Sequence, residues 1–116
     1  MMLHFGRFGS GRVLARPTVE AMVTDQLSPG EKAVSGFYPG YFDTRGWGFG
    51  LSVTTARDGI ASVPGRFGWD GGLGTSWFSD PAEDLVGILL TQKAGFPQFT
   101  NLYLDFWTSV YQSIAD

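Results

Sequence analysis

Apolar and polar positions along the chain follow two different periods. From Trp47 to Thr55, bulky and small residues alternate one by one, which predicts a β-strand with one bulky face and one small face. From Asn101 onward, aromatic and aliphatic residues recur at helical spacing, which predicts a final amphipathic helix packed on a sheet. A similar stripe of Val19, Met22, Val23 and Leu27 predicts a helix that begins at Pro17 and ends before Ser28.

Two more segments are predicted to form strands. Leu85 to Gln92 is almost continuously apolar, a pattern typical of a strand buried on both faces. Arg66 to Pro81 is predicted to form one β-hairpin, because three glycines (Gly71, Gly72 and Gly74) turn an aromatic strand back. Asp80-Pro81 is expected to end the second strand, since proline cannot donate to a ladder.

The remaining segments carry turn and loop signals. Met1 to Phe5 is predicted to be the end of a helix whose beginning is absent, before a glycine-rich turn. Glu31 to Gly46 is predicted to be a long loop with aromatic anchors, and such loops often border a binding site. Ala56 to Gly65 is predicted to be a turn region, and Lys93 to Thr100 a further loop.

These elements together predict an α+β fold. The expected architecture is an antiparallel sheet of three to four strands with helices packed on it. The chain has 116 residues, which is the size of one domain, so a single domain over residues 1–116 is expected.

Composition excludes several function classes. The net charge of −3 argues against a nucleic-acid partner, and no cysteine is present for a disulfide or a thiolate. His4 is the only histidine, so a histidine-rich metal site is excluded, and neither a metal nor another cofactor is expected. No apolar run approaches the roughly 20 residues of a membrane span.

The predicted hairpin resembles the third motif of the serine β-lactamase, penicillin-binding-protein and class C-like esterase family. In that motif, Lys-Thr-Gly or His-Thr-Gly lies on a strand and is followed by a glycine turn, a second strand and Asp-Pro. Trp69-Asp70-Gly71 falls at the place of the first triplet, and Gly74-Thr75-Ser76 and Asp80-Pro81 follow in order.

Other segments resemble the family in the same order along the chain. They are Leu14 to Leu27 (a helix), Trp47-Gly48-Phe49-Gly50-Leu51 (a strand), Leu85 to Gln92 (the last strand) and Asp105-Phe106-Trp107 (the start of the last helix). The resemblance covers nearly all of this chain but only the C-terminal portion of the family's domain. It therefore implies an incomplete β-lactamase/transpeptidase-like domain.

The resemblance also implies a chemistry, the hydrolysis of an ester or amide through an acyl-enzyme. Trp69, Asp70 and Gly71 would then form a wall beside the substrate, and the backbone N–H of Gly72 would be one oxyanion donor. Trp69 cannot present the cation that Lys or His offers to a substrate carboxylate, so a small neutral ester or amide is expected. For Asp70, a catalytic role and the turn chemistry of Asp-Gly both stay open.

The residues that would start such a reaction are missing from the sequence. It contains no Ser-x-x-Lys, in which the amine lies one helical turn from the hydroxyl, and neither Tyr-x-Asn nor Gly-x-Ser-x-Gly. With His4 alone, a Ser-His-Asp triad is not expected either. The chain is therefore expected to be inactive by itself.

Two alternatives remain from the sequence. One is a small binding module in which Trp47, Trp69 and Trp77 form an aromatic platform for sugars or peptides, which would leave several of these rings in solvent. The hydrolase interpretation instead buries Trp47 and leaves Trp69 at the edge of a cleft. The other alternative is half of a split hydrolase, because Leu85 to Gln92 is expected to present an open apolar edge for self-association or for a complementing chain.

Overall fold

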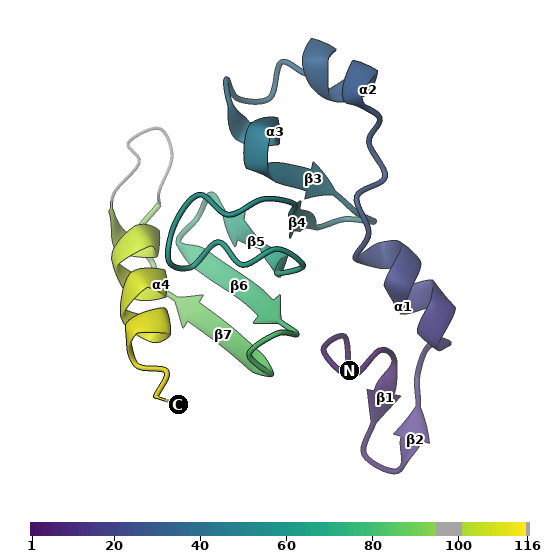
Figure 1. Cartoon of the computed structure of the whole chain (residues 1–116). Helices are drawn as coiled ribbons and strands as arrows, with labels where there is room; N and C mark the ends of the chain where they lie inside the picture. The colour runs from purple at the N-terminus through teal and green to yellow at the C-terminus, as the bar shows by residue number, and fades with distance from the viewer. Residues whose placement is uncertain (95–100, 116) are drawn as a thin grey trace.

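The computed structural model describes residues 1–94 and 101–115, and the fold is α+β, as predicted (Figure 1). The helices are α1 (Arg16–Met22), α2 (Pro29–Val34), α3 (Tyr41–Thr44) and α4 (Leu102–Gln112). The strands are β1 (Arg7–Phe8), β2 (Gly11–Arg12), β3 (Arg45–Trp47), β4 (Ser52–Thr54), β5 (Phe67–Gly71), β6 (Thr75–Asp80) and β7 (Leu85–Leu90).

The main sheet is antiparallel and has five strands in the order β3-β4-β5-β6-β7, so the expected number of three to four strands was too low. The extra strand arises because the predicted strand Trp47 to Thr55 is in fact a hairpin, in which Trp47 pairs with Ser52. Gly50, at φ +81°, lies in the turn between them. The alternation of bulky and small residues is not interrupted at Gly50, because a glycine fits the small position whether its φ is negative or positive. The sequence pattern therefore gave no sign of the turn.

The predicted small face is confirmed at Gly48, and Gly46, which precedes the predicted strand, lies close to a neighbour as well. A Cβ on Gly48 would lie 1.9 Å from the carbonyl oxygen of Met22, and one on Gly46 would lie 2.2 Å from the Asp25 carboxyl carbon. The Asp25 carboxylate accepts a hydrogen bond from the Trp47 N–H and pairs with the Lys32 ammonium. These contacts fix the end of α1 against the sheet.

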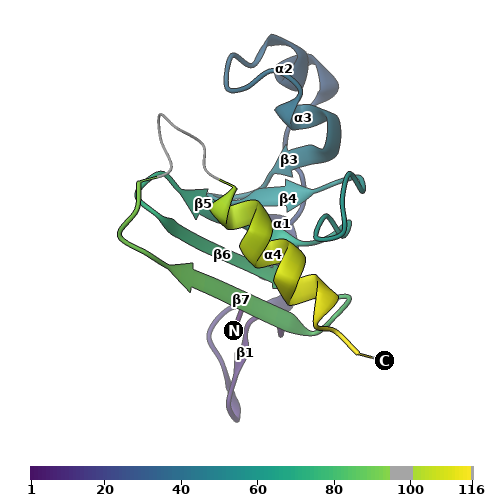
Figure 2. The same cartoon turned by 90° about the vertical axis from the view of Figure 1, so that its left-hand side faces the viewer.

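The predicted hairpin is confirmed as β5 and β6, which pair from Phe67 opposite Ser79 to Gly71 opposite Thr75. Strand β6 ends at Asp80, immediately before Pro81, as expected. The final helix is confirmed as well, and it lies across one face of β5, β6 and β7 (Figure 2).

Helix α4 packs on the sheet through Trp107, which is 5% exposed. Its neighbours in this core are Ala61, Val63, Phe78 and Tyr111. Gly87 of β7 makes room for the indole ring, since a Cβ there would lie 2.4 Å from two ring carbons. The opposite face carries a second core of Leu51, Val53 and Phe67, against which Met2, Val23 and Trp77 pack.

Strand β7 lies at the edge of the sheet. It was predicted to be buried on both faces, and this was wrong for the described residues. Val86, Ile88 and Leu90 share one face of β7 and are 47%, 59% and 76% exposed. Within residues 1–94 and 101–115, no helix or strand covers this face of β7 (Figures 1 and 2).

The N-terminal third departs most from the prediction. Helix α1 ends at Met22 instead of Leu27, and Ser28 caps a separate helix, α2, through a capping box with Glu31. The predicted loop from Glu31 to Gly46 therefore contains most of α2, all of α3 and the start of β3. Ser28 is followed by proline at the first helical position and by glutamate at the third, which is a typical helix start. This start is stable here although Gly30 favours a turn.

Residues 1–5 form turns and not the end of a helix, and Phe5 has a left-handed φ of +47°. The glycine-rich turn after them is the hairpin of β1 and β2. The turn region from Ala56 to Gly65 contains no helix or strand, as predicted. The predicted loop from Lys93 to Thr100 lies outside the described residues from position 95 onward. No helix in the described part of the chain is both long and apolar enough to cross a membrane.

Candidate functional site

The end of β5 brings the predicted site residues together. Trp69, Asp70 and Gly71 are its last three residues, and Gly72 is the first residue of the turn to β6. Trp69 is 37% exposed, Asp70 and Gly71 are half-buried, and Gly72 is exposed. A Cβ on Gly72 would meet no atom within 4 Å, so the space beside this peptide is open.

Aromatic side chains surround Trp69. Its ring lies 4.7 Å from the ring of Trp47, edge to face, and 6.0 Å from the ring of Phe37, centroid to centroid. Trp77, opposite Trp69 in the ladder, is half-buried, as is Trp47, which was expected to be buried. The three rings therefore do not all face solvent, and the aromatic-platform interpretation receives no support from their exposure.

Asp70 is held by a chain of hydrogen bonds from α4. The Ser76 hydroxyl donates to Asp70 Oδ1 at 2.5 Å, and Trp107 Nε1–H donates to the same hydroxyl oxygen at 2.7 Å. Burial raises the pKa of Asp70, although the Ser76 hydrogen bond and the charges of Arg66 and Arg45 act in the opposite direction. Ser76 is 2% exposed, so this connection is shielded from water.

A hollow of about 330 Å³ lies beside Asp70. Its walls come from the segment before β3, from the start of β3, from Asp58 and from β5. They are formed by Tyr38, Pro39, Gly40, Tyr41, Thr44, Arg45, Asp58 and Asp70. The Tyr41 hydroxyl donates to Ser52 Oγ at 2.7 Å, and burial raises the pKa of Tyr41. The predicted role of residues 31–46 as a border of a site is consistent with this arrangement.

Asp58 and Arg45 form an ion pair on the wall of this hollow, with Nη1 and Oδ2 3.2 Å apart. Burial would raise the pKa of Asp58, but hydrogen bonds from Ser62, Thr44 and Arg45 outweigh it and hold this pKa at about 2. Asp58 and Asp70 therefore line the same hollow with pKa values shifted in opposite directions.

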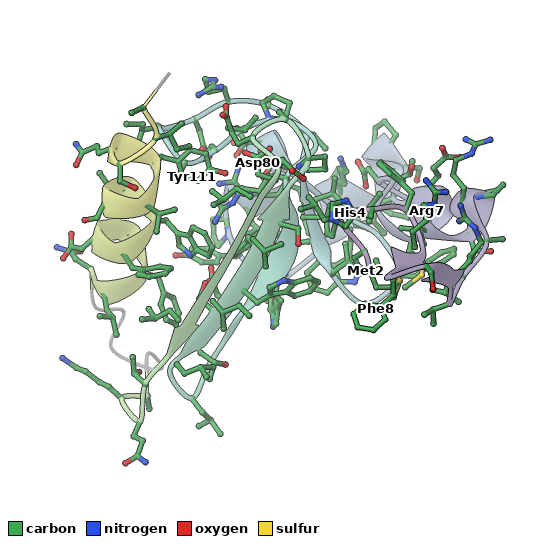
Figure 3. The ribbon with its side chains drawn as sticks, turned by 90° about the horizontal axis from the view of Figure 1, so that it is seen from below. Met2, His4, Arg7, Phe8, Asp80 and Tyr111 are labelled. Carbon is green, nitrogen blue, oxygen red and sulfur yellow. The ribbon has the colours of Figure 1, made fainter. Side chains whose placement is uncertain are left out.

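A larger hollow, of about 840 Å³, lies among the first nine residues. Its walls include His4, Arg7 and Phe8, and none of the predicted site residues (Figure 3). No group of three or more metal-binding side chains is found in residues 1–94 and 101–115.

Sequence reasoning missed the polar function of α4. Tyr103, Trp107 and Tyr111 were predicted only as part of an apolar stripe, yet each donates a hydrogen bond to the β5–β6 hairpin. Tyr111 Oη donates to Asp80 Oδ2 at 2.6 Å (Figure 3). The signal was present in the sequence, because residues at i, i+4 and i+8 share a face, and Tyr and Trp usually find polar partners when buried.

Comparisons with known proteins agree with this architecture. The family model described as "Beta-lactamase" matches residues 2–107. "Uncharacterized protein MT1414" and "Protein Rv1367c", from two strains of Mycobacterium tuberculosis (CDC 1551 / Oshkosh and ATCC 25618 / H37Rv), are each 36% identical to this chain over 99 residues. Each alignment covers 79% of this chain and 24% of the relative.

Among solved structures, the chain is similar to "EstCE1, a hydrolase with promiscuous acyltransferase activity", with a TM-score of 0.65 and 23% identity. The match covers 95% of this chain and 27% of that one, and at 23% identity it shows a likeness of fold alone. The chain thus spans about a quarter of the length of the relatives that it matches.

The two aspartates of the smaller hollow make a matched pair for a test of the electrostatics. We expect Asp70→Asn to raise the free energy of unfolding at pH 7, by a few tenths to about 1 kcal/mol, because the buried carboxylate is ionised at a penalty there. We expect Asp58→Asn to lower the free energy of unfolding, because it removes the ion pair with Arg45. The loss should be at most about 1 kcal/mol, because solvent partly screens this pair.

The pH dependence follows from the directions of the two shifts. A raised pKa at Asp70 means that its contribution to stability falls as pH rises above the unfolded value of 3.8, so Asp70→Asn should resemble the natural chain at pH 3. A lowered pKa at Asp58 means that its contribution is lost as pH falls from 3.8 toward 2. Urea unfolding of both variants at pH 7 and pH 3 measures this, and a loss of stability in Asp70→Asn at pH 7 would contradict the account.

Proposed function

Because this chain belongs to the β-lactamase family, we propose that it forms one wall of a serine hydrolase site that cleaves an ester or amide through an acyl-enzyme. The observation that supports this most is the end of β5, where Trp69, Asp70 and Gly71 lie beside an open space at Gly72. In this proposal the three residues line the substrate, and the Gly72 N–H is one of two donors to the oxyanion.

The environment of Trp69 supports a neutral substrate. An indole at this place offers an apolar face, and its neighbours Trp47 and Phe37 are aromatic too. Asp70 adds a carboxylate, which would repel a substrate carboxylate. A small ester or amide without a negative charge therefore fits this wall better than a charged peptide or a penicillin.

The proposal assigns the nucleophile and its base to another polypeptide segment. No serine of this chain is followed three residues later by lysine, and the match covers only about a quarter of the length of the relatives. Formation of the acyl-enzyme requires a serine activated by an adjacent base, and the wall alone does not provide these two groups.

This proposal predicts that the purified chain does not turn over an activated ester. The chain would be incubated with a p-nitrophenyl ester of a short acid, and release of p-nitrophenol would be followed by absorbance. After each rate is corrected for spontaneous hydrolysis of the ester in the same solvent, the folded chain should release p-nitrophenol no faster than the chain unfolded in urea. Turnover by the folded chain that exceeds this control, and that disappears on heating, would contradict the proposal.

We further propose that the bare face of β7 receives the polypeptide that carries the rest of such a domain. Val86, Ile88 and Leu90 form this bare face, and they lie at a sheet edge, where unpaired backbone groups also invite an added strand. Exposed apolar patches of this kind usually mark an interface. The quarter-length match to the relatives supports a partner segment larger than the chain itself.

Without that partner, the bare face should make the purified chain self-associate. Light scattering after gel filtration should give a mass above the 12.6 kDa of one chain. Ile88→Lys, which places a charge on the bare face, should shift the mass toward the monomer. Leu104→Lys is the matched control, since Leu104 is 66% exposed on α4, and it should leave association unchanged. A natural chain that stays monomeric would count against the bare face as an interface.

A further inference from the structure

Three side chains of α4 hold the β5–β6 hairpin at three points. Tyr103 bonds to the carbonyl oxygen of Gly71 at 2.6 Å, Trp107 to Ser76, and Tyr111 to Asp80. The three donors are four residues apart, so they lie along one face of the helix. The partner of Tyr103 is the one that belongs to the proposed substrate wall itself.

The Tyr103 hydroxyl anchors the turn between β5 and β6. It donates to the carbonyl oxygen of Gly71, the last residue of β5. Gly74 has φ +100°, and its own N–H also bonds to the carbonyl of Gly71 at 3.3 Å. The Gly71 carbonyl oxygen therefore accepts from both the Tyr103 hydroxyl and the Gly74 N–H, at the base of a turn that consists largely of glycine.

Fixing the Gly71 carbonyl also fixes the neighbouring N–H. The carbonyl of Gly71 and the N–H of Gly72 belong to one planar trans peptide, in which the two bonds point in opposite directions. With the carbonyl directed at Tyr103 on α4, the Gly72 N–H must point away from that hydroxyl. A peptide between two glycines rotates easily when nothing holds it, because glycine accepts positive and negative φ alike.

We propose that Tyr103 is a positioning residue that orients the Gly72 N–H as an oxyanion donor. This inference rests on the proposed function, since the ligand of that N–H would be the oxyanion that forms when an ester or amide carbonyl is attacked. Such a donor works only when its direction is set before the reaction. Trp107 acts in parallel on Asp70, through Ser76, so α4 positions two consecutive parts of the same wall.

The test compares Tyr103→Phe with Tyr111→Phe by nuclear magnetic resonance of the 15N-labelled chain. Both variants lose one hydroxyl that α4 donates to the hairpin, and both should be less stable than the natural chain. We expect Tyr103→Phe alone to shift and broaden the Gly72 amide signal, with exchange on the microsecond-to-millisecond scale as the peptide rotates. Tyr111→Phe should leave the Gly72 signal unchanged.

Two results would overturn the inference. One is a Gly72 amide in Tyr103→Phe with the shift and relaxation of the natural chain, and the other is the same Gly72 change in both variants. If Tyr103→Phe does not fold, the order parameter of the Gly72 N–H is measured in the natural chain instead. The tether predicts a value of about 0.85, typical of rigid backbone, although Gly72 is exposed. A value below about 0.6 would contradict the tether. No readout involves turnover, so failure of the hydrolase proposal would appear separately, in the ester assay.

Discussion

The contact between Trp107 and the sheet is the constraint on which the rest of the structure depends. Its indole ring occupies the space left by Gly87, and its N–H reaches Ser76 on the neighbouring strand. The guanidinium of Arg66, only 6% exposed, lies 4.2 Å from the same ring and 3.9 Å from that of Phe78. A buried cation is tolerated here because aromatic faces and the Ala61 carbonyl replace part of its hydration.

This contact connects the core to the proposed site without a loop between them. The Ser76 hydroxyl accepts from Trp107 and donates to Asp70, so two consecutive hydrogen bonds connect helix α4 to the wall. Asp70 keeps a half-buried carboxylate although burial disfavours its charge. A group retained against such a penalty is typical of a functional site, and the hydrogen bonds from α4 explain how it is held.

The hairpin and the final helix could be predicted from the sequence because their signals are local and strong. A turn is strongly favoured by three glycines within four residues, Gly71, Gly72 and Gly74. A helix is favoured by the apolar residues that recur at helical spacing from Tyr103 to Tyr111. The division of Trp47 to Thr55 could not be predicted, since a positive φ at Gly50 leaves the alternation intact. The Tyr103 tether could not be predicted either, because it joins residues 32 positions apart and depends on how the helix lies on the sheet.

The central claim is that the chain provides a wall of an acyl-transfer site without its own activated nucleophile. The most direct measurement is to treat the purified, folded chain with a fluorophosphonate, which reacts with activated serines, and to determine its intact mass. The account predicts an unmodified mass. A single adduct on the folded chain, absent when the chain is unfolded, would show that one of its own serines is activated and would contradict the account.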